Sequence, residues 1–130
     1  MIEPSDIRQG KLADCWFLSA AAAIAEFPKL VERLILTKEV NDFGVYRIRL
    51  CKNGEWQEIV VDDYFPCYPK DGPIFSSVSG NELWVMLLEK AYAKVHGSYK
   101  TLSGGSPYYA LMDLTGCPTI RYDFKEDAHV

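Results

Sequence analysis

The chain has 130 residues, of which 48% are hydrophobic and 25% charged, and its formal net charge is −4 at pH 7. These values are ordinary for one folded domain, and the length is sufficient for a single hydrophobic core. The 14 lysines and arginines are dispersed along the chain, which argues against a nucleic-acid partner. No apolar run approaches the roughly 20 residues that span a bilayer, so we predict no transmembrane segment.

The first clear element is an apolar run from Cys15 to Ala25. It is apolar almost all round, which is typical of a buried helix. Asp14 can cap the free amide groups at its start, and Pro28 ends it. Aliphatic residues spaced four apart predict a second, short helical segment from residue 29 to about residue 36.

Two strands are predicted next. Residues 45–51 alternate, with Tyr46, Ile48 and Leu50 on one face and arginines on the other. Asn53-Gly54 is a strong hairpin signal, and residues 56–62 form the returning strand. A third short strand is expected near residues 74–75.

Two further helices complete the prediction. Ser79-Gly80-Asn81-Glu82 is typical of a capping box, and the helix that it begins runs through Val95 and is terminated by Gly97. Its predicted buried stripe consists of Trp84, Leu87, Leu88, Ala91, Tyr92 and Val95.

Residues 99–105 are expected to form a loop before the last helix. Ser106 and Pro107 take the N-cap and first-turn positions of that helix, which continues to about Leu114 and ends at Gly116. The fold class is therefore α+β, with helices packed around a small antiparallel sheet.

The four cysteines lie at positions 15, 51, 67 and 117, without the paired spacing of a zinc site or the density of a disulfide scaffold. This spacing indicates a reduced, cytoplasmic protein. Cys51, Cys67 and Cys117 are interpreted as small packing residues.

Cys15 has the surroundings of a thiol nucleophile. At the start of a helix it meets the positive end of the helix dipole, which favours the thiolate that attacks carbonyl carbon. Gln9, six residues earlier, can join the Cys15 backbone N–H in binding an oxyanion. Cys15 and Gln9 are therefore the candidate catalytic residues.

The stretch Gln9-Gly10-Lys11-Leu12-Ala13-Asp14-Cys15-Trp16-Phe17-Leu18 resembles the active-site segment of calpains, the papain-like cysteine proteases, although Ala13 stands where calpains usually have glycine. Further calpain-like motifs follow in calpain order: Glu55-Trp56 with Val60-Val61-Asp62-Asp63, Gly80-Asn81-Glu82-Leu83-Trp84, Leu87-Leu88-Glu89-Lys90-Ala91-Tyr92-Ala93-Lys94 and Leu102-Ser103-Gly104-Gly105-Ser106. The resemblance implies that residues 1–130 form the first lobe of a papain-like protease core. The second lobe of the parent chain would then supply the catalytic histidine and asparagine.

The two histidines of this chain do not match the calpain context for that base. His96 is interpreted as a solvated residue at a helix C-terminus, where a cation is favoured, and His129 as a tail residue. A cysteine protease needs a base within hydrogen-bond reach of its thiol. We therefore expect these 130 residues alone to be inactive as a peptidase.

The resemblance also implies ligand-binding residues. Paired glycines in a loop, such as Gly104 and Gly105, ordinarily indicate a turn. The resemblance to calpains implies that the backbone of these two residues lies along the cleft and forms hydrogen bonds with an extended protein or peptide substrate. No EF-hand loop is present, and no organic cofactor is expected. Conventional calpains bind one calcium ion in this lobe, and Asp6 and Glu82 match two of its carboxylate ligands.

Simpler interpretations of the acidic residues stay open. Glu82 is also the third residue of the capping box, and Asp6 can cap a turn. Asp62 and Asp63 are adjacent in a strand, where side chains point to opposite faces, so we expect them to cap a turn rather than chelate an ion.

Three functions remain open at this point. The first is the nucleophile lobe of a calcium-dependent type of endopeptidase that makes limited cuts through an acyl-enzyme on Cys15. The second is a noncatalytic calpain-like binding or regulatory domain, and the third is a papain-fold transferase or amidase. The pairing of Cys15 with Gln9 argues against the second, and the calpain-like motifs outside the active site argue against the third.

Overall fold

The computed structural model describes residues 7–8, 15–39, 41–65, 67–68, 72–73, 77–78 and 83–122, with side chains for 15–39, 41–65 and 83–122. The main elements are the helices α1 (Cys15–Ala25), α2 (Pro28–Leu34), α3 (Trp84–His96) and α4 (Pro107–Thr115), the 3-10 helix η2 (Tyr99–Leu102), and the strands β2 (Val45–Lys52) and β3 (Glu55–Asp62). Two further antiparallel ladders join two-residue strands: β1 (Ile7–Arg8) with β6 (Ser77–Val78), and β4 (Cys67–Tyr68) with β5 (Gly72–Pro73).

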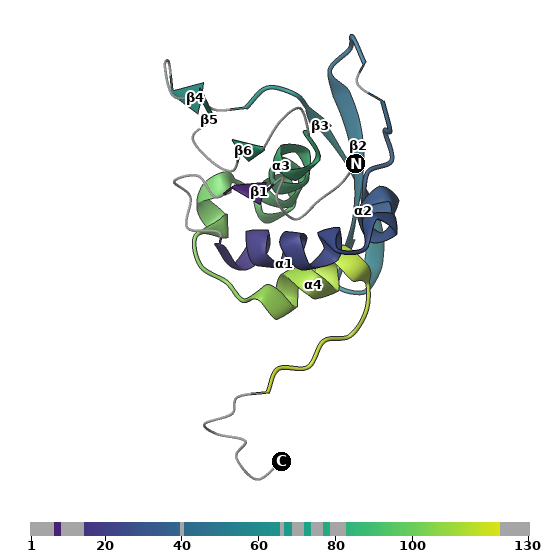
Figure 1. Ribbon diagram of the computed structural model, residues 1–130, viewed down its shortest axis with the longest axis vertical. Coiled ribbons are helices and arrows are strands. Elements are labelled where there is room, and N and C mark those ends of the chain that lie inside the picture. The colour runs from purple at the N-terminus through teal and green to yellow at the C-terminus, as the bar shows by residue number, and fades with distance from the viewer. Residues whose placement is uncertain are drawn as a thin grey trace.

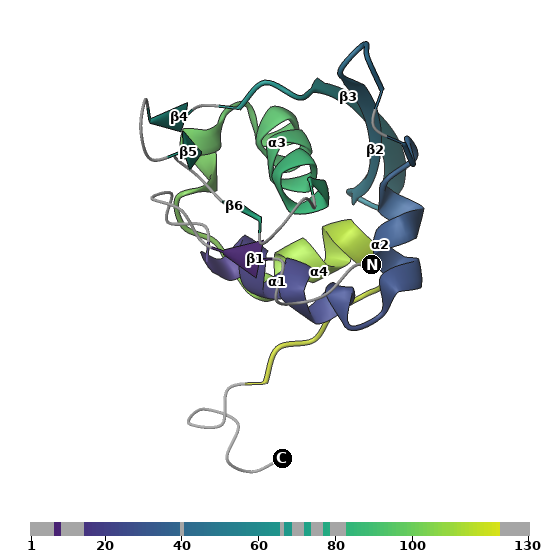
Figure 2. The same ribbon diagram turned by 45° about the horizontal axis from the view of Figure 1, so that its top comes forward.

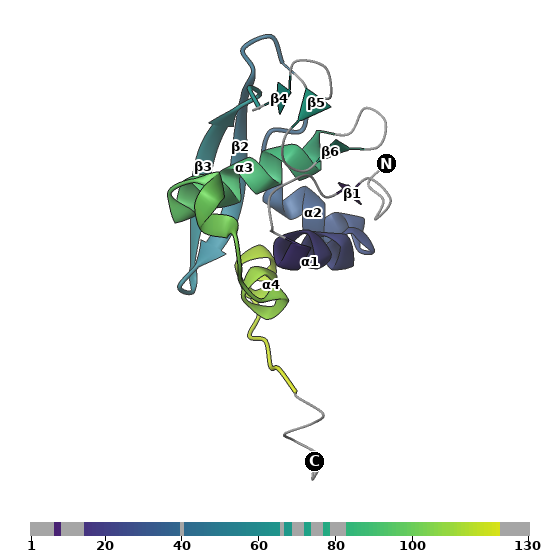
Figure 3. The same ribbon diagram turned by 90° about the vertical axis from the view of Figure 1, so that its left-hand side faces the viewer.

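The elements are arranged around α3, which has the β2–β3 hairpin on one side and the pair α1 and α4 on another (Figures 1 and 2). Figure 3 shows α3 lying across the hairpin, with α4 and α1 next to each other below it. The predicted α+β class is confirmed. The predicted strand near residues 74–75 lies outside the described residues.

The hairpin follows its sequence signals closely. Asn53 and Gly54 both have positive φ, 53° and 79°, and connect strands paired from Lys52↔Glu55 to Val45↔Asp62. The predicted inner face is buried: Tyr46, Ile48 and Leu50 are each at most 2% exposed. On the outer face Arg47 forms an ion pair with Glu58.

The first two helices show one difference from prediction. Helix α1 has the predicted bounds, but Pro28 begins α2 instead of only ending α1, because its fixed φ suits the first helical position and its missing N–H is not needed there. Helix α2 also ends earlier, at Leu34, because Ile35 is extended and bridges to Ile48 of β2. A β-branched residue suits that extended conformation.

Helix α3 is buried on more sides than its predicted stripe. Gly97 ends it with φ 103°, as predicted, whereas Val95 is only half-buried. Other members of the helix are buried in addition, namely Val85, Met86, Glu89 and Ala93. This follows from the central position of α3, which packs against the hairpin and against η2. The helix begins at Trp84 after Leu83, and the predicted capping box at residues 79–82 lies outside the described residues.

The segment after α3 is more ordered than the predicted loop. Residues 99–102 form η2, in which the Thr101 hydroxyl donates to the Ser98 carbonyl. Such local side-chain bonding favours a short turn of helix. Helix α4 then begins at Pro107 and ends at Gly116, whose φ of 73° is left-handed, so both predicted ends are confirmed.

The core is centred on three aromatic rings. Phe17 and Tyr92 lie with ring centroids 4.6 Å apart, and Trp16 packs edge-on against Tyr92 at 5.8 Å. These contacts join α1 to α3. Aromatic pairs of this kind stabilise a fold by more than the burial of their apolar surface alone. None of the helices in the described part of the chain is long and apolar enough to cross a membrane.

Two glycines of positive φ allow a matched test of packing at the end of α4. An alanine Cβ at Gly116 would lie 2.7 Å from the Trp56 ring, whereas one at Gly54 would meet nothing within 4 Å. Both Gly116→Ala and Gly54→Ala incur the left-handed backbone cost of about 1–2 kcal/mol. We expect Gly116→Ala to lower the free energy of unfolding by about 1–3 kcal/mol more, because Trp56 must move. Urea denaturation measures both, and equal losses would contradict the Trp56 contact.

Candidate active site

The predicted nucleophile lies at the very start of a buried helix. Cys15 is the first residue of α1, and its thiol is free and exposed. The next residues, Trp16, Phe17 and Leu18, are all buried, so the core fixes the helix turn that carries the thiol. Gln9 and Asp14 lie outside the described residues, and the oxyanion role of Gln9 therefore stays a prediction.

The residue after Cys15 contacts the loop of residues 103–106, which carries Gly104 and Gly105 and which we call the glycine loop. The buried Trp16 indole Nε1 donates a hydrogen bond of 2.9 Å to the Leu102 carbonyl. A Cβ on Gly105 would lie only 2.5 Å from the Trp16 ring. Gly105 is therefore needed for packing, whatever its role toward a substrate. Sequence reasoning used Trp16 only as a motif residue and did not find this contact.

Gly104 differs from its neighbour. It has a φ of 97°, and an added Cβ there would meet nothing within 4 Å. The glycine is explained by its backbone angle, and the main chain beside it is open to an approaching molecule. Trp16, which follows Cys15 in the chain, thus contacts the loop that carries the predicted substrate-binding pair.

One face of α1 remains uncovered by the described residues. Cys15, Ser19 and Ala23 are exposed, whereas all other residues of this apolar helix are buried except Ala22, which is half-buried. Their spacing of four residues places them on one side of the helix. We call Cys15, Ser19 and Ala23 the small-residue stripe, and the thiol lies at its N-terminal end.

A polar cluster that the sequence did not predict joins β2, α3 and α4. The Asp113 Oδ2 atom of α4 accepts a hydrogen bond from the Tyr92 hydroxyl at 2.5 Å and pairs with the Lys52 Nζ at 3.0 Å. Burial, followed by the bond to Asp113, raises the pKa of Tyr92 well above its usual value. Lys52, Tyr92 and Asp113 are 21 to 61 residues apart in sequence, so no local motif indicates them.

His96 belongs to this cluster, and its interpretation as a solvated residue is wrong. Its ring is half-buried and stacks on Tyr92 with centroids 4.5 Å apart. The Lys52 Nζ lies 3.4 Å from its Nε2. An ammonium group can only donate, so Nε2 accepts and the ring proton is on Nδ1. Burial, and then the charge of Lys52, lower the pKa of His96, while Asp113 opposes them.

Among the acidic residues considered as metal ligands, Asp62 is described by the structure and has a structural role. Asp62 accepts a hydrogen bond of 3.0 Å from the Tyr64 backbone N–H and pairs with Lys90, so its predicted turn-capping role is confirmed. Lys90 and the Tyr64 bond lower the pKa of Asp62. No group of three metal-binding side chains occurs among the described residues. Asp6 and Glu82 lie outside them.

The other cysteines divide into two cases. Cys51 is 6% exposed and packs in the interior, as predicted. Cys117 is exposed, so its interpretation as a packing residue is wrong, because the chain turns outward after Gly116. The side chain of Cys67 and the residue His129 lie outside the described parts of the structure.

Comparison with known proteins agrees with this arrangement. The family described as "Calpain family cysteine protease" matches residues 1–130. The chain belongs to this family. Its α+β fold with an exposed cysteine at the start of α1 is consistent with half of a calpain protease core.

Individual relatives are similar over most of this chain. The calpain-type cysteine protease DEK1 of Zea mays is 53% identical over 116 residues, which is 88% of this chain and 5% of that protein. Calpain-A of Drosophila melanogaster is 41% identical over 93% of this chain and 15% of its own length. For the calpain-1 catalytic subunit of Rattus norvegicus the identity is 42%, over 94% of this chain and 18% of that protein. The chain therefore spans a small part of each of these relatives.

The lowered pKa of His96 predicts a pH dependence of stability. The unfolded chain, with an ordinary histidine, binds a proton at a higher pH than the folded protein does. The stability that neutral His96 contributes is therefore complete above about pH 6.5, the pKa of histidine in the unfolded chain. It is lost as the pH falls from that value through the lower pKa of His96 in the folded protein.

Urea unfolding at pH 7.5 and pH 5.5, compared with His96→Gln, measures this effect. All other titrating groups, including Lys52 and Asp113 around the ring, are shared by the two proteins. We expect the wild-type protein to lose more stability on acidification than the variant. An equal loss in both would show that His96 does not resist protonation.

Proposed function

We propose that this chain is the nucleophile-bearing lobe of a cytoplasmic calpain-type cysteine endopeptidase that makes limited cuts in protein substrates. The observation that carries this proposal is the exposed Cys15 thiol on the first turn of a buried helix, with the glycine loop bound by the next residue, Trp16. Family membership supports the same chemistry. The free thiols of Cys15, Cys51 and Cys117 support a reducing location.

The reaction would proceed through a thioester on Cys15. Its thiolate attacks the substrate carbonyl carbon, and the resulting oxyanion is stabilised by the Cys15 backbone N–H and the Gln9 side-chain amide. The C–N bond breaks as the leaving amine takes a proton from an imidazolium. Water then hydrolyses the thioester and returns the proton to the imidazole.

The imidazole would come from a second lobe of the parent protein. His96, the one histidine in the described residues, is held between Lys52 and the Tyr92 ring and does not serve the thiol. The small-residue stripe of α1 offers a face onto which a second lobe can pack closely beside Cys15. We therefore propose that residues 1–130 alone do not cleave peptides.

Substrate would bind as an extended strand along the glycine loop. The open backbone at Gly104 and the absence of a side chain at Gly105 would allow main-chain hydrogen bonds to the substrate. Binding of this kind gives affinity with little demand on substrate sequence. It would suit limited cleavage at accessible, extended segments of a folded protein.

Two exposed cysteines allow a matched test of the thiol in the intact protein. We expect an epoxide directed at cysteine proteases to label Cys15 far faster than Cys117, as measured by peptide mass spectrometry. Cys15→Ser should lower casein cleavage at least 1,000-fold, because removing the nucleophile removes covalent catalysis. Cys117→Ser should leave cleavage unchanged. Equal labelling of the two thiols would favour a noncatalytic binding or regulatory domain instead.

Calcium is the cofactor that we propose for this lobe, with Asp6 and Glu82 as carboxylate ligands. A hard cation of this type prefers oxygen ligands, and bound calcium would stabilise the fold that positions Cys15. The proposal rests on the positions of Asp6 and Glu82 in the sequence, which match two carboxylate ligands of conventional calpains.

The test compares Asp6→Asn/Glu82→Gln with Glu39→Gln/Glu55→Gln, a control pair of exposed carboxylates. Glutamine at position 82 removes charge but preserves a capping box. Calcium at 100 times its dissociation constant should stabilise the wild-type and control proteins by about 2.7 kcal/mol, and the first variant by much less. Equal stabilisation of all three, measured by thermal unfolding, would exclude this site.

A further inference from the structure

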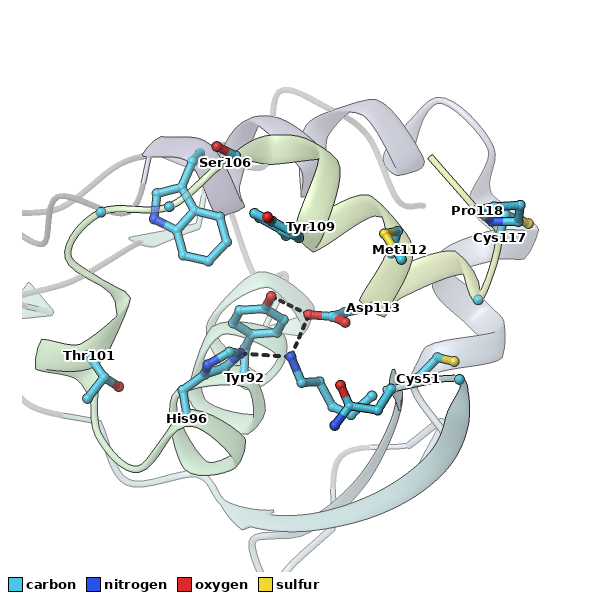
Figure 4. A pocket seen from close by; sticks show the side chains of 17 residues that line it. Cys51, Tyr92, His96, Thr101, Ser106, Tyr109, Met112, Asp113, Cys117 and Pro118 are labelled. Carbon is cyan, nitrogen blue, oxygen red and sulfur yellow. Dashed lines mark hydrogen bonds and ion pairs between the residues drawn. The ribbon is translucent and has the colours of Figure 1, made fainter. Parts of the chain in front are cut away.

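A cavity of about 630 Å³ lies between the β2–β3 hairpin turn, the end of α3, the glycine loop and α4. Figure 4 shows side chains from α3 and α4 facing each other across it, with the dashed bonds of the Asp113 cluster between them. Cys15 is not among the residues that line it. Its volume falls within the range of roughly 300–1,000 Å³ that is typical of small-molecule sites.

Aromatic and thioether groups form part of its wall. Trp16 and Tyr92 contribute buried rings, while Tyr109 and Met112 of α4 are 56% and 39% exposed although they line the same cavity. Large apolar side chains that remain exposed around a hollow indicate an occupant that would cover them. A flat aromatic group would fit between such walls and contact their faces.

At the polar end of the cavity, the Lys52 ammonium has one more hydrogen-bond donor than it has polar partners among the described residues. The Lys52 ammonium has three N–H groups, and its polar partners among the described residues are Asp113 and His96. The Asp113 Oδ2 already accepts two hydrogen bonds, from Tyr92 and Lys52. The group that this end of the cavity lacks is therefore an acceptor close to the third Lys52 donor, preferably one with negative charge.

We propose that this cavity binds a small aromatic carboxylic acid, with its ring against Tyr109 and Met112 of α4 and its carboxylate on the Lys52 ammonium. The ligand would also contact Trp16, the residue that holds the glycine loop. Cys15 does not line the cavity, but Gly104 and Gly105, which the proposed function assigns to substrate binding, do. Ligand binding to the cavity is measurable without peptidase activity, so the result does not depend on the proposed function.

The test is calorimetric titration of the intact protein with 1-naphthylacetate and with 1-naphthylacetamide, which has the same ring but no charge. We expect the acid to bind at least ten times more tightly than the amide. Lys52→Met should remove this preference, while Lys38→Met, a substitution of an exposed lysine outside the cavity, should preserve it. No binding of either probe, or equal binding of both, would overturn the proposal.

A second variant addresses the cavity without disturbing Asp113. Met112→Trp changes a partly exposed residue of α4 and fills space beside Tyr109. It should weaken the binding of both probes at least tenfold. Its thermal unfolding temperature should stay close to that of the wild-type protein. Undiminished binding to this folded variant would place the probes elsewhere and overturn the proposal. The Met112→Trp variant also tests the proposal if Lys52→Met fails to fold.

Discussion

The hydrogen bond from the Trp16 indole to the Leu102 carbonyl is the contact on which the candidate active site depends. It joins residues 86 apart in sequence, and it is buried, so losing it would leave a carbonyl without a partner inside the protein. The same indole packs edge-on against Tyr92 and leaves no room for a side chain at Gly105. One side chain therefore sets the relative positions of the thiol helix, the central helix α3 and the glycine loop.

Much of the fold could be predicted because its signals are local. The Asn53-Gly54 turn defines the hairpin register, and the Pro107 and Gly116 positions define both ends of α4. The errors occurred where tertiary contacts decided the outcome. Ile35 leaves the helix because it pairs with Ile48, and α3 is buried beyond one stripe because elements pack on several of its sides. Periodicity alone contains neither contact.

The site shows the same division between local and long-range information. The place of Cys15 at a helix start was predictable from the apolar run that follows it. The surroundings of His96 were not, because it contacts Lys52, which lies 44 residues away on the hairpin. Gly104 and Gly105 look equivalent in sequence, yet one is explained by its backbone angle and the other by the Trp16 ring. Only the folded arrangement separates these two causes.

The position of Asp113 has a consequence for how the fold assembles. It lies in the last turn of α4, where the helix dipole is negative and a carboxylate is unfavourable. Lys52, at the end of β2, supplies the opposite charge, and Tyr92 of α3 adds a hydrogen bond. The contacts that Asp113 makes with the hairpin and α3 therefore offset this unfavourable position and stabilise the final turn of α4. Through them, formation of that turn is coupled to docking of the hairpin.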